Sequence, residues 1–92
     1  MTAFSVAYEK LVDAIAERAR SDEPRKTYVV VPESMAFDLC KGGTHYFDPT
    51  LRYKLRNRGP SALKNEWFLG HRLWVDKKAT VVRFENERDL PK

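Results

Sequence analysis

Apolar side chains recur at intervals of three and four between residues 3 and 20, and charged side chains fill the positions between them. This spacing places the apolar set on one face of a helix and the charged set on the other. Thr2 or Ser5 is suited to cap the start. Pro24 stops the helix, because proline cannot donate to its hydrogen-bond ladder. The apolar positions are Phe4, Tyr8, Leu11, Val12, Ile15 and Ala19.

A strand and a short helix are the next predicted elements. Residues 28–31 read Tyr-Val-Val-Val and are bounded by prolines, which is typical of a buried central strand. Pro32 and Glu33 then open a helix, because proline and an acidic residue both suit a first helical turn. Apolar residues follow at helical spacing until Gly42 and Gly43 end the helix.

The stretch FDPTLRYKLRNRGP, residues 47–60, carries two conflicting signals. Basic side chains occupy every even position from 52 to 58, and this period of two indicates a strand. Asp48 as a cap, Pro49 at the first helical position and Gly59-Pro60 as a stop favour a helix instead, which we expect. In either case the charges point to solvent. They belong to Arg52, Lys54, Arg56 and Arg58.

Two strands are predicted in the last third of the chain. Residues 71–76 and 80–85 alternate between apolar and polar side chains, which indicates a half-buried hairpin around the turn at residues 76–78. Gly70 marks a bulge or a bend. Residues 85–92 are polar, and we expect them to form a frayed tail.

Together these elements predict an α+β fold in a single domain that spans residues 1–92. The expected architecture is a small sheet of three or four strands, antiparallel or mixed, with two or three helices packed on one face. The 92 residues include 42% hydrophobic and 12% aromatic side chains, which is enough for one thin core and excludes a disordered chain.

Charge concentrates in one part of the sequence. The net charge is +4, but residues 49–65 hold five of the 17 basic residues and no acidic one, which leaves 12 basic against 13 acidic elsewhere. A local basic patch suits docking on one anionic surface, whether nucleic acid or acidic protein. The alternative is a solvated basic face without a ligand. The candidate binding residues are Arg52, Tyr53, Lys54, Arg56, Arg58, Lys64, Arg72 and Trp74.

Trp74 enters that set because it shares a predicted strand face with Arg72, opposite the apolar face of the same strand. A tryptophan beside an arginine is typical of binding hot spots and of platforms on which nucleobases stack. The alternative is that Trp74 packs beneath the basic segment.

No catalytic, cofactor or metal motif is present in the sequence. His45 and His71 are the only histidines, and acid–base catalysis would require them to converge in space. Cys40 is a single cysteine, and we expect a buried thiol. No apolar run is long enough to span a membrane, and the N-terminus lacks a secretory pattern, which favours residence in the cytosol. We therefore expect a binding protein without cofactor or metal rather than an enzyme.

In length, polarised charge, aromatic content and lack of catalytic motifs, the chain resembles small phage-encoded proteins that disable host machinery. With the opening MTAFSVAYEKLVDAIAERAR, it is most similar to the anti-CRISPR proteins of type I-F, in particular the family numbered eighth. The resemblance implies a stoichiometric inhibitor in the cytoplasm of the infected bacterial host. Its partner would be the multi-subunit RNA-guided surveillance complex, contacted through its protein subunits alone or also through its guide RNA, and it would block hybridisation or binding of target DNA. Because these inhibitors share no motif, no residue role is transferred.

Two other resemblances suggest different functions. YVVVPESMAFDLCK and WFLGHRLWVD are similar to runs in phage major capsid proteins, which implies a structural or assembly module. The small size and the basic patch also resemble mRNA-cleaving toxins and other small RNA-binding proteins. The last predicted strand, ATVVRFENE, has a single arginine, which departs from the arginine-rich final strand of those toxins.

Overall fold

Helices and short strands alternate along the chain in the computed structural model, which describes residues 2–42 and 50–91 and, within α3, leaves the side chain of Arg52 undescribed. In chain order the elements are α1 Ala3–Ala19, β1 Tyr28–Pro32, α2 Glu33–Gly42, α3 Leu51–Arg58, the 3-10 helix η2 Gly59–Leu63, β2 Trp67–Phe68, β3 His71–Asp76, β4 Arg83–Glu85 and the 3-10 helix η3 Glu87–Asp89.

The first three elements confirm the sequence predictions. α1 begins after Thr2, whose Oγ1 accepts a hydrogen bond from the backbone N–H of Ser5 at 3.0 Å and so caps the helix. Leu11 and Ile15 lie on its buried face. α2 follows β1 directly and carries Glu33 in its first turn, where the helix dipole favours an acid.

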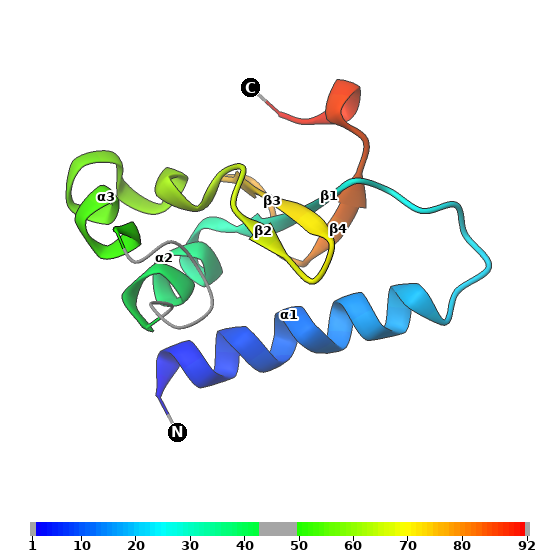
Figure 1. The fold of residues 1–92 in the computed structure, drawn as a ribbon, viewed down its shortest axis with the longest axis horizontal. Coiled ribbons are helices and arrows are strands. Elements are labelled where there is room, and N and C mark those ends of the chain that lie inside the picture. Colours follow the sequence, from blue (N-terminus) through cyan, green and yellow to red (C-terminus); the bar gives the residue numbers. More distant parts are fainter. Residues whose placement is uncertain (1, 43–49, 92) are drawn as a thin grey trace.

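The sheet has four strands in the order β2-β3-β1-β4 (Figure 1). β1 pairs in parallel with β3 and antiparallel with β4, and β2 pairs antiparallel with β3. β1 is therefore central, as predicted, and the sheet is mixed. The predicted hairpin between residues 71–76 and 80–85 is wrong, because β3 and β4 lie on opposite sides of β1. A central strand needs hydrogen-bond partners on both edges, and β4 supplies the second one.

The core lies between one face of the sheet and the helices α1 and α2. Val29 and Val31 of β1 pair with Leu73 and Val75 of β3, and these four side chains belong to the same buried cluster as the inner faces of both helices. Figure 1 shows α1 running along this side of the sheet. The α+β fold with a small sheet and helices on one face is thus confirmed.

The basic segment forms a helix, which settles the conflict between its two signals. α3 begins at Leu51 after Thr50, and the predicted cap Asp48 and first helical residue Pro49 lie outside the described residues. Gly59 ends the helix with φ +65°, a conformation that glycine adopts at little cost. The following residues were expected to form a loop but form the 3-10 helix η2, with Pro60 in its first turn.

Gly70 bends the chain, as expected. Together with Leu69 it forms the two-residue turn between β2 and β3. Both residues have positive φ, +48° at Leu69 and +81° at Gly70, as a tight turn between antiparallel strands requires. At the opposite edge of the sheet, residues 86–91 continue past β4 through η3. The carbonyl oxygen of Pro91 accepts a hydrogen bond from Trp74 Nε1 at 2.9 Å.

Candidate functional site

α3 is held to the protein by a narrow apolar stripe. Leu51 is fully buried and Leu55 is half-buried against the core, four residues further along the same face. Tyr53 is 68% exposed, and Arg56 and Arg58 are exposed as well. The helix therefore turns Tyr53, Arg56 and Arg58 to solvent, as the sequence predicts for these residues.

Lys54 is half-buried and takes part in an interaction within the protein, so it is not one of the solvent-exposed cations of α3. The side chain of Arg52 lies outside the description. Of the four predicted cations of this segment, Arg56 and Arg58 are thus the two that the structure places on the open surface.

η2 connects α3 to the sheet, and the basic residues continue past it onto the sheet. Leu63 is fully buried, which anchors the connection, and Lys64 follows it on the surface of the sheet. The Nζ of Lys64 lies 4.6 Å from the centre of the Trp74 ring. This cation–π contact joins two residues that the sequence analysis proposed separately.

The face of the sheet opposite α1 and α2, here called the outer face, carries a second cation–π pair. Trp67 of β2 lies opposite Arg72 of β3 in the antiparallel register, and the Arg72 guanidinium carbon is 4.5 Å from the centre of the Trp67 ring. Arg72 Nη1 also donates to the carbonyl oxygen of Asn65 at 3.4 Å. Trp67 is 57% exposed, so an aromatic ring with an adjacent cation is presented to solvent.

Trp74 occupies the same face but is half-buried. Its ring packs edge-on against Tyr28 at 6.1 Å, and its Nε1 is bonded to Pro91. The chain segment that covers it is the C-terminal one, with Leu90 and Glu87 lining a cavity of about 220 Å³ beside it, rather than α3. The open aromatic residue of the outer face is therefore Trp67, which the sequence analysis missed.

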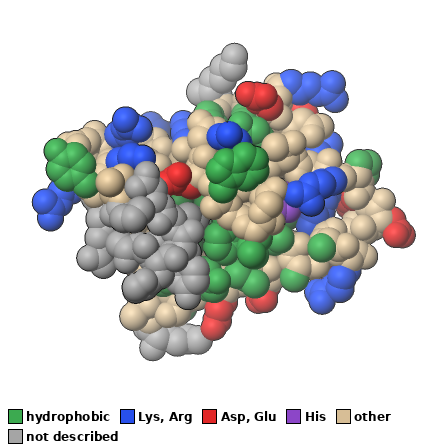
Figure 2. Space-filling model, viewed as in Figure 1, with side chains coloured by type: hydrophobic (Ala, Val, Ile, Leu, Met, Phe, Trp, Pro, Cys, Tyr) green, Lys and Arg blue, Asp and Glu red, His purple; other side chains and the backbone are tan. Residues whose placement is uncertain are grey.

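We call the set Tyr53, Arg56, Arg58, Lys64, Trp67, Arg72 and Trp74 the basic–aromatic surface. Within the part of the chain that the structure describes, no carboxylate forms an ion pair with Arg56, Arg58, Lys64 or Arg72. Figure 2 shows basic side chains gathered over α3 and again beside a hydrophobic side chain over the sheet. The surface thus combines unneutralised cations with two exposed rings.

The nucleophile and acid–base candidates have a different environment. Cys40 is buried, as predicted, and burial, with a smaller contribution from Glu66, raises the pKa of its thiol to about 11. A thiol with that pKa is protonated at neutral pH and is a poor nucleophile. His45 lies outside the described residues, so the convergence with His71 that acid–base catalysis would require is untested.

His71 is buried at the start of β3, and its Nδ1 lies 3.2 Å from the carbonyl oxygen of Lys26. Burial and the nearby charge of Arg25 lower its pKa. No cluster of three or more potential metal ligands occurs among residues 2–42 and 50–91. None of the helices in those ranges combines the length and apolar character that a membrane span requires.

Comparison with known proteins adds no relative: no family model, no curated protein and no solved structure matches this chain. The functional argument therefore depends on the geometry and charge of the basic–aromatic surface.

Proposed function

We propose that the chain is a binding protein without an activity of its own, which acts as a stoichiometric inhibitor of an RNA-guided type I-F CRISPR surveillance complex. The observation that carries the proposal is the basic–aromatic surface, where the cations Arg56, Arg58 and Arg72 have no carboxylate partner among the described residues and Tyr53 and Trp67 are exposed. Such a surface binds an anionic partner most favourably, because the negative charges of the partner neutralise the cations.

Its composition also fits the two components that a nucleoprotein presents. Arginine and lysine contact phosphates, while exposed aromatic rings stack on bases or fill apolar hollows on protein. The chain would occupy the complex, in the cytoplasm of the infected host, and block hybridisation of target DNA with the guide RNA. The sequence resemblance to type I-F inhibitors supports this choice of nucleoprotein.

Co-purification with a type I-F surveillance complex at several salt concentrations tests the proposal, followed by a gel-shift assay with target DNA. We expect a stable complex that no longer binds DNA, with association that weakens steeply as salt rises. The pair Arg56→Glu and Arg58→Glu should weaken association by at least about tenfold, which corresponds to about 1.4 kcal/mol. Association that is unaffected by this pair would refute the role of α3.

A matched control separates local from global charge. Lys10 and Arg20 are exposed on α1, away from the basic–aromatic surface, so Lys10→Glu with Arg20→Glu changes the net charge by the same amount. We expect this control to retain association. Circular dichroism of both double variants should match that of the parent, because none of the four side chains is buried.

Direct binding of single-stranded RNA is a second candidate, and the exposed Trp67–Arg72 pair favours it. Fluorescence of the tryptophans on addition of a short labelled RNA tests it, with Trp67→Phe as the control for the ring involved. Binding to free RNA without association to the surveillance complex would replace the inhibitor proposal with this one.

A further inference from the structure

A second basic site lies at the other end of the protein from α3, where the segment of residues 20–27 returns from α1 to β1 (Figure 1). A cavity of about 240 Å³ opens there between the last turn of α1, this segment and the start of β3. Its polar lining consists of Arg18, Ser21, Glu23, Arg25, Lys26 and His71. None of these residues belongs to the basic–aromatic surface.

Gly70 allows Arg25 to reach this cavity. Its φ of +81° turns the chain between β2 and β3, and its carbonyl oxygen accepts a hydrogen bond from Arg25 Nη2 at 2.8 Å. A Cβ at position 70 would lie 3.2 Å from that nitrogen, so a larger residue would displace the arginine as well as strain the turn. Arg25 is thereby fixed close to the imidazole of His71.

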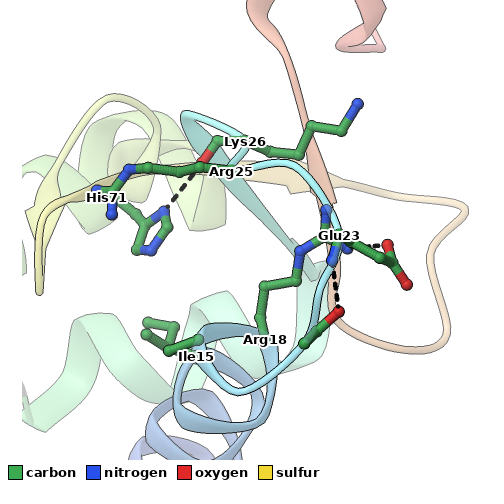
Figure 3. Close-up of a pocket in the computed structure, with 8 residues that line it drawn as sticks. Ile15, Arg18, Glu23, Arg25, Lys26 and His71 are labelled. Carbon is green, nitrogen blue, oxygen red and sulfur yellow. Dashed lines mark hydrogen bonds and ion pairs between the residues drawn. The ribbon is translucent and has the colours of Figure 1, made fainter.

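The tautomer of neutral His71 follows from its hydrogen bond. A carbonyl oxygen only accepts, so Nδ1 carries the hydrogen that it donates to Lys26, and Nε2 keeps its lone pair. Figure 3 shows the imidazole and the Arg18 side chain on two sides of the space above Ile15, with the Arg18 guanidinium turned toward Glu23. The cavity therefore presents a hydrogen-bond acceptor on one side and a guanidinium on the other.

Arg18 has an unused donor in this region. Its Nη1 donates to Glu23 and its Nη2 donates to the carbonyl oxygen of Pro24 at 2.8 Å, but its Nε is buried without a hydrogen-bond partner among the described residues. A buried donor of a charged group is stabilised when an acceptor reaches it. An oxyanion in the cavity would supply that acceptor.

The charges that surround the cavity favour an anion. Arg18, Arg25 and Lys26 contribute three positive charges and Glu23 one negative charge, a local balance of +2 with neutral His71. The negative end of the α1 dipole opposes this, but the backbone N–H of Arg20 caps the last carbonyl oxygens of the helix. The residues that line the cavity therefore carry a positive balance of charge.

We propose that this cavity binds a terminal phosphate group, with Arg18 Nε and the Arg25 guanidinium as donors and His71 Nε2 as the acceptor for a phosphate hydroxyl. A terminal phosphate has its second pKa at about 6, so a fraction of it still holds a proton near neutral pH, whereas a phosphodiester has none to donate. The same chemistry occurs in inorganic phosphate and at the phosphorylated end of a nucleic acid. The site is independent of the proposed inhibitor function.

Nuclear magnetic resonance of the His71 ring and the Arg18 Nε–H tests the proposal, with sodium phosphate compared to sodium chloride at equal ionic strength. Phosphate should shift both signals saturably, because the hydroxyl would bind His71 Nε2 and an oxygen would bind the Arg18 Nε–H. Shifts that do not saturate, or that chloride reproduces, would overturn the site.

Two variants test the donor assignment. Arg18→Lys keeps the charge but removes the Nε–H, and we expect at least about a tenfold loss of phosphate affinity. Arg56→Lys on α3 is the matched control and should bind as the parent does. Equal affinity of all three proteins would overturn the role of Arg18. If Arg18→Lys fails to fold, the titration of the parent protein still decides the proposal.

Trinucleotides with and without a 5′-phosphate distinguish the two sources of the phosphate group, inorganic phosphate and the phosphorylated end of a nucleic acid. They also test the preference for a terminal phosphate over a phosphodiester. A shift at His71 with the phosphorylated trinucleotide, absent with the other, assigns a nucleic-acid end. A shift with inorganic phosphate alone assigns a free phosphate. Equal shifts with both trinucleotides would overturn the terminal-phosphate assignment.

Discussion

Truncation of Leu51 is the sharpest test of how α3 is anchored. Leu51 is the fully buried side chain of α3, and the other side chains described on this helix are half-buried or exposed. Leu51→Ala removes three carbon atoms, which costs about 2.4 kcal/mol in transfer free energy at about 0.8 kcal/mol each. The cavity left behind raises the total to about 3–4 kcal/mol, within the range of buried leucine truncations.

Urea denaturation followed by circular dichroism measures this loss, with Tyr53→Ala on the exposed side of the same helix as the control. We expect the control to change the free energy of unfolding by less than about 0.5 kcal/mol, since its ring is largely in solvent. Hydrogen exchange should show that Leu51→Ala lowers protection in α3 before it lowers protection in β1. A loss below about 1 kcal/mol for Leu51→Ala would refute the reasoning, because it would mean that the site collapses or that α3 contributes little to the fold.

Three further predictions concern buried groups. Burial and Arg25 lower the pKa of His71 in the folded protein, so the unfolded chain binds a proton there first as the pH falls. The contribution of His71 to stability is therefore complete above about pH 6.5 and is lost as the pH drops through the folded pKa. Thermal melts at several pH values should show this slope in the parent protein and not in His71→Asn. Gly42→Ala places a Cβ 2.5 Å from Phe4 Cγ and should lower the free energy of unfolding by about 1–2 kcal/mol, and adding Phe4→Leu should restore part of that stability. A more stable Gly42→Ala protein would contradict the close approach of α1 and α2. Cys40, with its raised pKa, should react with a thiol reagent at neutral pH only after denaturant is added, and rapid reaction in the folded protein would show that the thiol is accessible.

Local signals predicted the helices well because their causes are local. The apolar spacing of α1, the proline before α2 and the glycine after α3 each act within a few residues. The helix punctuation of α3 prevailed over its period-two charge pattern because Leu51 and Leu55, four residues apart, share one helical face, and that face packs on the core.

Strand pairing could not be predicted in the same way. Alternation shows which side chains of residues 71–76 are buried, but it does not show which strand lies beside them. The completely buried run Val29–Val31 was the available clue, because a strand without exposed side chains lies inside a sheet and needs two neighbours. Because β2 pairs with β3, the second edge of β1 is left for β4.

The same limit applies to the candidate site. Trp67 was missed because β2 is only two residues long, so its sequence shows no alternation. Trp74 was assigned correctly to the outer face with Arg72, but its environment depends on Pro91, 17 residues further along the chain. Contacts of that kind are set by the fold, and the sequence pattern around the tryptophan carries no sign of them.

Stability and binding are separable on α3, and this explains how a helix with so much like charge persists. Lys54 and Arg58 are four residues apart, and a like-charged pair at that spacing costs an exposed helix about 0.2–0.5 kcal/mol. The anchor at Leu51 offsets this cost about tenfold, so the free protein can keep the helix folded with Arg56 and Arg58 exposed to solvent. An anionic partner would then remove the repulsion at the moment of binding. Under the proposed function, the cations therefore set affinity and salt dependence, while the leucine sets the fold, and substitutions at the two kinds of position should act on different measurements.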